Sequence, residues 1–326
     1  MNHALRIHEY GGPEKLLWEE VPVPGPKAGE ALVRHAAIGL NYIDVYFRNG
    51  LYKAPALPAV IGMEAAGVVE AVGEGVTEVA PGDRVAYATG PLGAYSEARV
   101  IKAERLVKLP DGISDEVAAA AMLQGLTAQY LLRRTYPVKP GETILVHAAA
   151  GGVGLILCQW AKALGCTVIG TAGTEGKAEL ARAHGAAHVI LPGEDLAARV
   201  KAITGGAMLP VVYDSVGRDT FMPSLDCLAP LGMMVSYGNA SGPVPPVDLG
   251  LLAAKGSLYV TRPTLASYTA KRADLVANAA DLFDAVQSGA VRVLVNQHWP
   301  LREAADAHRA LEARRTTGST VLLPAG

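Results

Sequence analysis

The stretch Thr143–Gly165 (TILVHAAAGGVGLILCQWAKALG) contains residue types that suit a dinucleotide phosphate. An apolar run leads into a turn of small residues, and apolar residues at helical spacing follow. Small residues let backbone N–H groups approach a pyrophosphate at a helix N-terminus, where the macrodipole favours negative charge. We expect this turn to bind a nicotinamide or flavin nucleotide through Ala150, Gly151, Gly152 and Val153.

The turn departs from the G-x-G-x-x-G pattern at one position. Ala149, Gly151 and Gly154 stand where the three glycines would be, so the first is replaced by alanine. The alternative to a nucleotide site is an ordinary strand-to-helix turn of an α/β protein. The rest of the chain favours the nucleotide interpretation.

Composition excludes several classes of protein. The 326 residues carry a formal net charge of −2, and no run of Lys and Arg forms a basic stripe, so we expect no nucleic-acid partner. No apolar stretch approaches the ~20 residues that span a bilayer, and the N-terminus lacks the pattern of a secretory signal, so we expect no membrane partner. The three cysteines form no Cys-x-x-Cys pair, which favours buried, reduced thiols in a cytoplasmic enzyme.

The pattern of elements changes along the chain. Up to about Lys108, short strands broken by Gly and Pro predict a β-rich, barrel-like domain. A helix with Ser114 as its N-cap follows. From Thr143, six strands alternate with helices, which predicts an α/β fold with a doubly wound, six-stranded parallel sheet. We assign this dinucleotide-binding domain to residues 126–264.

From about Leu265 the elements cannot extend that parallel sheet. A helix, a strand, a second helix and a terminal strand are expected there. We infer that these elements return to the first domain, which is then discontinuous and comprises residues 1–125 and 265–326.

Several segments together resemble one known family. IGLNYIDVYFRNGLY, GMEAAGVVEAVGEGV, PGDRVAY, HAAAGGVGLILCQWAKALG and SYGNASG are similar to segments of the medium-chain dehydrogenase/reductase superfamily. With AMLQGLTAQYLL and VVYDSVGRDTF, they resemble its NADPH:quinone oxidoreductase, or zeta-crystallin-like, branch. The resemblance covers essentially the whole chain. It implies a GroES-like catalytic domain, a Rossmann domain, an active site in the cleft between them, and a homodimer paired through the edge of the last Rossmann strand, here SLYVTRP.

The ligands of a zinc alcohol dehydrogenase are missing from this sequence. Relatives that bind zinc have Gly-His-Glu where this chain has Gly62-Met63-Glu64, and no cysteine precedes Cys158. A zinc site needs three or four such ligands, so we expect no zinc. Without that Lewis acid an alkoxide loses its usual stabiliser. A quinone suits such a site better, because it accepts hydride readily and its reduced oxyanion is delocalised.

The turn after the second strand of the expected Rossmann domain favours NADPH over NADH. An NAD site usually has an Asp or Glu there for the ribose hydroxyl, whereas this turn is neutral and Glu175 comes slightly late. A lysine suits a 2′-phosphate. The family pattern Gly-Thr-x-x-Lys is present, although the tyrosine of the branch after the third strand is replaced by Leu191-Pro192. The residues expected to contact the 2′-phosphate are Gly173, Thr174 and Lys177.

The resemblance also assigns residues to the substrate and the nicotinamide. It implies that Asn41 and Thr127 hold the nicotinamide-ribose end. Tyr46 and Tyr52 are expected to donate hydrogen bonds to a quinone oxygen or to stack on the ring, or else to pack between domains. Asp44 is either a structural cap or a proton relay.

Other cofactor contacts are expected beyond the ends of later strands. Ser215, Gly238 and Asn239 follow the fourth and fifth strands, whose carboxyl ends face the ligand crevice of such a sheet. Arg262 follows the sixth strand. Arg314 lies in a segment that resembles a cofactor-contacting stretch of the family, although a surface helix residue is the alternative.

Three functions stay open at this point. The first is zinc-independent hydride transfer from NADPH to a quinone. The second is NADPH-dependent reduction of an alkenal or enone by the same donor. The third is a non-catalytic, crystallin-like role that binds NADPH or RNA.

Overall fold

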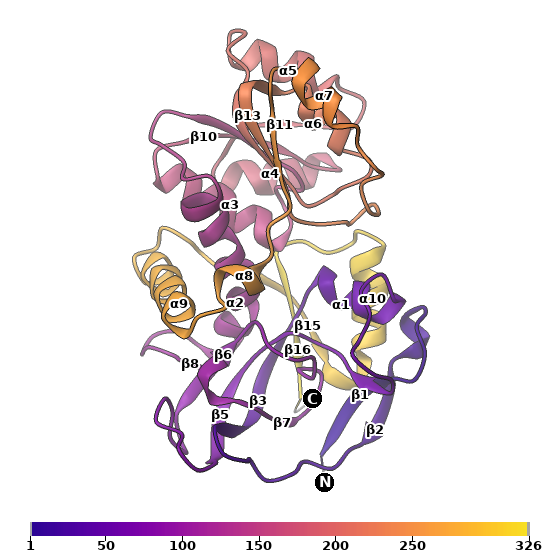
Figure 1. The fold of residues 1–326 in the computed structure, drawn as a ribbon, viewed down its shortest axis with the longest axis vertical. Helices are drawn as coiled ribbons and strands as arrows, with labels where there is room; N and C mark the ends of the chain where they lie inside the picture. The colour runs from indigo at the N-terminus through magenta and orange to yellow at the C-terminus, as the bar shows by residue number, and fades with distance from the viewer. Residues whose placement is uncertain (1, 325–326) are drawn as a thin grey trace. The chain divides into compact units, whose positions relative to one another are not determined.

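The computed structural model describes residues 2–324, which form two compact units (Figure 1). The first unit contains the described residues up to Leu126, together with Tyr268–Gln287 and the chain from Val293 onward. The second contains Thr127–Ser267 and Ser288–Arg292. No helix among residues 2–324 combines the length and the apolar character that crossing a membrane requires.

The second unit is built on a six-stranded parallel sheet. Its strand order is β11-β10-β9-β12-β13-β14, which is the order of a full dinucleotide-binding sheet and confirms the predicted fold class. The central strands are almost entirely apolar because helices cover both faces of such a sheet. The strands are β9 (Thr143–Val146), β10 (Thr167–Thr171), β11 (Ala186–Ile190), β12 (Leu209–Asp214), β13 (Leu228–Ser236) and β14 (Tyr259–Thr261).

Helices follow these strands, and three of them begin at polar caps. Thr174, Asp195 and Asp248 each accept a hydrogen bond from a first-turn N–H of the helix that they precede. The apolar faces of the helices close a core that includes the fully buried Leu145 and Val212. The helices are α3 (Gly152–Ala163), α4 (Glu175–Ala183), α5 (Leu196–Ile203), α6 (Phe221–Leu225), α7 (Leu249–Ala254) and α8 (Leu265–Tyr268).

The alanine in the glycine-rich turn has a packing partner. A Cβ built on Gly170 of β10 would lie 2.7 Å from the Cβ of Ala149. The missing side chain at position 170 therefore makes room for the extra methyl at position 149, which is fully buried. The departure from the G-x-G-x-x-G pattern is thus accommodated by the neighbouring strand.

The first unit contains two sheets. A three-stranded sheet has the order β2-β1-β4, and a larger one has the order β15-β16-β3-β5-β6-β8, with β7 also paired to β3. The strands from the C-terminal part of the chain thus continue the sheet formed by the N-terminal part. The strands are β1 (His3–Ile7), β2 (Leu17–Glu20), β3 (Glu30–Leu40), β4 (Ala59–Val60), β5 (Glu64–Val72), β6 (Arg84–Tyr87), β7 (Ala98–Lys102), β8 (Val107–Lys108), β15 (Val295–Pro300) and β16 (Ser319–Leu323).

The helices of the first unit come from distant parts of the chain. Ser114 caps α2 as expected, because its Oγ accepts a hydrogen bond from Val117 N–H at 3.2 Å. α2 runs past Leu126 into the second unit, where a π-helical turn (Leu131–Thr135) follows it. The α-helices are α1 (Tyr42–Asn49), α2 (Asp115–Tyr130), α9 (Arg272–Gln287) and α10 (Ala304–Glu312), and the 3-10 turns are η1 (Pro13–Lys15), η2 (Ala103–Arg105) and η4 (Leu301–Glu303).

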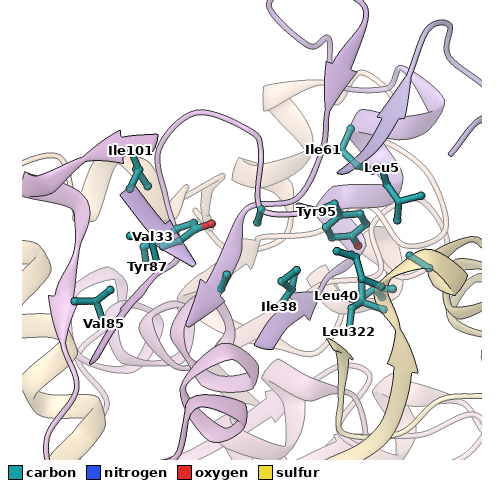
Figure 2. Packing of buried hydrophobic residues seen from close by; sticks show 14 of the residues in the cluster. Leu5, Val33, Ile38, Leu40, Ile61, Val85, Tyr87, Tyr95, Ile101 and Leu322 are labelled. Carbon is teal, nitrogen blue, oxygen red and sulfur yellow. The ribbon is translucent and has the colours of Figure 1, made fainter. Parts of the chain in front are cut away.

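One hydrophobic cluster holds the first unit together (Figure 2). It joins residues from both ends of the chain, including Leu5 of β1, Leu40 of β3 and Leu322 of β16. The Tyr95 ring lies among Leu5, Ile61 and Leu40 in Figure 2. The three cysteines are buried and free, as the sequence predicts.

Candidate active site

The glycine-rich turn ends where α3 begins. Gly151 is the N-cap, with extended φ and ψ of −80° and 173°, and the loop before it bends through Ala148 at a φ of 51°. In the described part of the chain no side chain caps this helix, and its first turn contains no acidic residue. The positive end of the α3 macrodipole is therefore not compensated by this chain and suits an anion.

Glycine is needed at positions 151 and 154 of the turn for different reasons. A Cβ on Gly154 would lie 2.3 Å from the Ala148 carbonyl oxygen, so this glycine allows α3 to approach the loop closely. Among residues 2–324, a Cβ on Gly151 would meet only that same oxygen, at 3.3 Å. Packing within the protein does not require glycine there, whereas the approach of a pyrophosphate does. The turn therefore fits a dinucleotide.

A buried histidine fixes the loop, and the sequence analysis did not identify it. The hydroxyl of Ser224 donates to the Thr220 carbonyl, so His147 Nε2–H donates to Ser224 Oγ at 2.8 Å. On the other side, Thr171 Oγ1 accepts from Ala148 N–H at 3.2 Å and donates to His147 Nδ1 at 3.1 Å. Burial lowers the pKa of His147, which agrees with this neutral tautomer. His147 thereby ties the loop to β10 and α6.

The turn between β10 and α4 has the predicted neutral character. Thr174 caps α4, and its Oγ1 accepts a hydrogen bond from Lys177 N–H at 3.4 Å. A Cβ on Gly173 would meet no atom of the described chain within 4 Å, so the turn borders open space. The carboxylate of Glu175 pairs with Arg182 at 2.6 Å, which leaves its charge compensated. This arrangement suits a 2′-phosphate.

The loops after β12 and β13 lie against each other. Ser215 and Gly238 come so close that a Cβ on Gly238 would be 2.2 Å from the Ser215 carbonyl oxygen. Buried Asp214 fixes the first loop, because its Oδ1 accepts from Val216 N–H at 2.7 Å and from Gly217 N–H at 3.2 Å. The structure thus brings two predicted cofactor residues together, and it adds Asp214, which the sequence analysis did not identify, as the residue that shapes their turn.

Arg262 binds the turn after β13. Its Nη1 donates to the carbonyls of Ser236 at 2.9 Å and of Gly238 at 3.1 Å. With the Asn239 amide turned so that its oxygen faces the guanidinium, that oxygen accepts from Arg262 Nη2 at 3.0 Å. The structure therefore places Arg262, Gly238 and Asn239 in one cluster at the carboxyl ends of β13 and β14.

Asn41 lies between two buried carboxylates in the first unit. Its backbone N–H donates to Asp44 Oδ2 at 2.8 Å, and its Nδ2 donates to Glu64 Oε2 at 2.5 Å. Its side-chain oxygen accepts from Gln124 at 3.1 Å. Asn41 is the N-cap of α1, and the bond to Asp44 is one half of a capping box. Asp44 therefore has the geometry of the structural cap that the sequence left as one of two alternatives.

Burial raises the pKa values of these two carboxyl groups. Burial raises the pKa of Asp44 to about 7, against hydrogen bonds from Asn41 N–H and Tyr95 that lower it. Burial raises the pKa of Glu64 to about 8, against hydrogen bonds from Leu123 N–H and Asn41 Nδ2 that lower it. The charge of Asp44 adds to the rise at Glu64. Two acids close to Asn41 thus titrate near neutral pH, a property typical of functional sites but also found in structural networks.

The two predicted substrate tyrosines form one aromatic cluster. The rings of Tyr46 and Tyr52 meet edge to face with centroids 5.2 Å apart, and Tyr52 also contacts Phe47 at 5.8 Å. Tyr52 N–H donates to the Tyr46 carbonyl at 3.0 Å, which folds the chain after α1 back onto the helix. The structure therefore brings Tyr46 and Tyr52 together at α1, the helix that also carries Asp44 and has Asn41 as its N-cap.

Thr127 and Arg314 occupy less regular positions. Thr127 is buried in α2, at the first residue of the second unit. The expected second closing helix ends earlier than the sequence suggests, because Arg314 takes a φ of 57° and Arg315 N–H bonds back to the Ala310 carbonyl at 3.0 Å. This Schellman ending usually uses glycine. Arg314 is exposed, as a surface residue would be, but it lies beyond the end of α10 at Glu312 and not within a helix.

Metal ligands do not cluster in this structure. Within residues 2–324, no group of three His, Cys, Asp or Glu side chains is placed to hold a metal ion. Met63 precedes the buried Glu64, whose carboxyl group is hydrogen-bonded to Asn41 and to Leu123 N–H.

The chain is similar to known dehydrogenases and reductases over almost its whole length. Two family models match the chain, the alcohol dehydrogenase GroES-like domain over residues 27–111 and the zinc-binding dehydrogenase over residues 152–282. A quinone oxidoreductase of Pseudomonas aeruginosa is 58% identical over 99% of this chain and 100% of that protein. The chain belongs to the quinone oxidoreductase family. It is thereby a member of the medium-chain dehydrogenase/reductase superfamily.

Solved structures of this quinone oxidoreductase family agree with the fold. The Escherichia coli quinone oxidoreductase, solved in complex with NADPH, matches with a TM-score of 0.97 and 52% identity, over 99% of this chain and 100% of that one. A 2-haloacrylate reductase of Burkholderia is also similar, at 48% identity over 98% of each chain. The relatives therefore include quinone oxidoreductases and also a 2-haloacrylate reductase.

Proposed function

We infer that this protein is an NADPH-dependent quinone oxidoreductase. The observation that carries the inference is a pair of turns in the second unit that suit phosphates: the uncapped N-terminus of α3 at Gly151 and the neutral turn with Lys177. A full-length relative with these folds has been solved with NADPH, and relatives at 52–58% identity are quinone oxidoreductases. We assign NADPH binding to the second unit and the substrate contacts to the first.

Residues of the second unit hold the cofactor in this proposal. NADPH supplies a hydride when it is bound. The backbone from Ala150 to Val153 binds the pyrophosphate, and Gly173, Thr174 and Lys177 bind the 2′-phosphate. The clustered turns after β12 and β13 border the rest of the cofactor. The residues of those turns are Ser215, Gly238 and Asn239, and Arg262 fixes the turn after β13 by hydrogen bonds to its carbonyls.

Residues of the first unit orient the substrate. Tyr46 and Tyr52 donate hydrogen bonds to the quinone oxygens or pack on the ring. Asn41 holds the nicotinamide-ribose end of the cofactor, a role that we also assign to Thr127 of the second unit. Arg314 contacts the cofactor. A quinone needs no Lewis acid for this step, since its reduced form is a stabilised, delocalised anion. We therefore propose a zinc-independent reaction, which the methionine at position 63 and the absence of cysteine before Cys158 in the sequence support.

A second candidate is the NADPH-dependent reduction of an activated alkene. The similarity to a 2-haloacrylate reductase at 48% identity favours it. Both reactions need the same hydride donor and a hydrogen-bond donor at an oxygen of the acceptor. The two candidates therefore differ only in which acceptor fits beside Tyr46 and Tyr52.

One experiment tests donor and acceptor together. We expect the purified protein to oxidise NADPH with a benzoquinone or naphthoquinone faster than with 2-haloacrylate or an enone, measured by absorbance. Lys177→Ala should weaken NADPH binding about tenfold, because a charge-assisted hydrogen bond is lost, and should leave NADH binding unchanged. NADH is the matched control, since it lacks the 2′-phosphate. Activity on alkenes alone would select the second candidate, and equal effects on both cofactors would remove Lys177 from the site.

The edge of the parallel sheet supports a homodimer. β14 ends the strand order, and its Tyr259 and Val260 are 58% and 41% exposed. An uncovered apolar edge invites pairing with a second copy. Sedimentation velocity should give twice the mass of the chain, and Val260→Pro, which disturbs pairing at the edge, should shift the protein to the monomer. A monomeric wild type would contradict this assignment.

Three buried free thiols fit a reducing, cytoplasmic compartment.

A further inference from the structure

A chain of buried polar side chains lies beneath the helix that carries Tyr46. It begins at Arg48 of α1, passes through His308 of α10 and Tyr95 before β7, and returns to Asp44 of α1. Arg48 is 1% exposed, and the other three are fully buried. Tyr95 lies in the hydrophobic core of the first unit (Figure 2). Most buried polar groups in proteins are hydrogen-bonded, and of these four side chains only Asp44 has an atom, Oδ1, without a partner among the described residues.

The direction of each hydrogen bond can be assigned. Arginine only donates, so Arg48 Nη1 donates to His308 Nδ1 at 3.0 Å. His308 is then the tautomer with its proton on Nε2, which donates to Tyr95 Oη at 3.0 Å. The Tyr95 hydroxyl donates to Asp44 Oδ2 at 3.1 Å, the same oxygen that accepts from the backbone N–H of residue 41. All the bonds run one way, from the guanidinium to the carboxylate.

At its Arg48 end, this network of side chains is completed by an ion pair with Glu312. Arg48 Nη1 and Nη2 each donate to one oxygen of Glu312 at 2.8 Å, and Arg48 Nε donates to the Gly11 carbonyl at 3.1 Å. Each of the three guanidinium nitrogens thus donates, and four of its five N–H groups are used. Arg48 lies in the last turn of α1 and Asp44 in its first, so the network holds both ends of this short helix.

The same groups rule out a proton path through the network. Arg48 does not lose its proton in proteins. Burial and the charge of Arg48 lower the pKa of His308 to about 3, so the imidazole does not take up a proton near neutral pH. A proton therefore cannot travel from Asp44 to Glu312 along this chain. What the chain does is fix α1 relative to α10 and to the segment before β7.

We propose that His308 and Tyr95 are positioning residues for the quinone, which they orient through α1 and the ring of Tyr46. The proposal rests on the proposed function. Tyr46 lies between the two anchored turns of α1, and its ring contacts Tyr52 at 5.2 Å. A displacement of α1 moves both tyrosines together, and displacements of about 1 Å at positioning groups cost up to roughly a hundredfold in rate. Asp44 belongs to the same positioning network.

The test compares variants that break the network with one that keeps it. We expect His308→Leu to raise the KM for the quinone roughly tenfold, with the Kd for NADPH changed less than about twofold. His308→Gln offers both an acceptor for Arg48 and a donor for Tyr95, so it should restore the KM to near the wild-type value. Tyr95→Phe removes one hydroxyl only, and it gives a milder variant with the same direction of change should His308→Leu fail to fold.

His35 provides the matched control in the same unit. It is also buried, its Nδ1–H donates to the Ser96 carbonyl at 2.6 Å, and its Nε2 accepts from Tyr87 at 2.8 Å. Burial lowers its pKa to about 3 as well. His35→Leu should lower the Tm as His308→Leu does while leaving the KM for the quinone unchanged.

The outcomes separate this proposal from the proposed function. An unchanged KM in both His308→Leu and Tyr95→Phe, with an active wild type, overturns the positioning role. An equal rise in KM in His35→Leu also overturns it, because general loosening of the unit then explains the effect. A wild type that reduces no quinone overturns the proposed function itself, whereas a KM raised by His308→Leu and restored by His308→Gln supports the positioning role.

Discussion

Replacing Gly151 by valine is expected to weaken NADPH binding at least about a hundredfold, or roughly 2.8 kcal/mol, while the protein stays folded. The backbone at Gly151 has φ and ψ of −80° and 173°, which valine adopts readily. Among the described residues, its Cβ would meet only the Ala148 carbonyl oxygen, at 3.3 Å. The rest of the side chain would project into the space that a pyrophosphate must occupy.

Two measurements check this expectation. Titration of the protein with NADPH gives the Kd, and thermal unfolding gives the Tm. The cost to stability should be no more than about 1 kcal/mol, the usual difference between a glycine and an apolar N-cap. Gly25→Val serves as the control, because Gly25 also borders open space and lies in the first unit. Unaltered affinity for NADPH in Gly151→Val would show that the turn is an ordinary strand-to-helix connection.

The fold was predictable because its signals are local. The strands of the parallel sheet are three to nine residues long and mostly apolar, and helices alternate with them as the sequence predicts. The alternation of β and α elements and the right-handedness of their connections limit the possible strand orders to a few, and the structure shows which one this chain adopts. Arg314 marks the limit, because its left-handed conformation depends on hydrogen bonds at the end of α10 and not on its residue type.

The candidate site was only partly predictable. Gly151, Lys177 and the strand-end residues carry a signal in their spacing along the chain. His308 carries none, since its partners Arg48 and Tyr95 are 260 and 213 residues away in the sequence. His147 follows β9 and Asp214 ends β12, and each offered a weak signal as a polar residue directly after a buried run. Their hydrogen-bond partners are set by the packing of loops, which a single sequence does not reveal.

Gly154→Ala is expected to have the opposite profile to Gly151→Val. A Cβ at position 154 would lie 2.3 Å from the Ala148 oxygen and 2.8 Å from the Ala149 Cα, both of which belong to the backbone. The loop cannot move away cheaply, because the backbone N–H groups of Ala148 and Ala149 are bound to Thr171 of β10. We expect a loss of about 3 kcal/mol in the free energy of unfolding, as in overpacked cores.

Thermal unfolding measures this loss, and a second helical glycine provides the control. Gly176 of α4 would meet no atom of the described chain within 4 Å if it carried a Cβ, so Gly176→Ala should stabilise the protein by about 0.5–1 kcal/mol. Gly154→Ala should instead lower the Tm by roughly 6–12 °C. A Tm equal to that of the wild type would mean that α3 and the loop are farther apart than these contacts require. Because Gly151 faces the cofactor and Gly154 faces the protein, the two variants separate binding from folding within one turn.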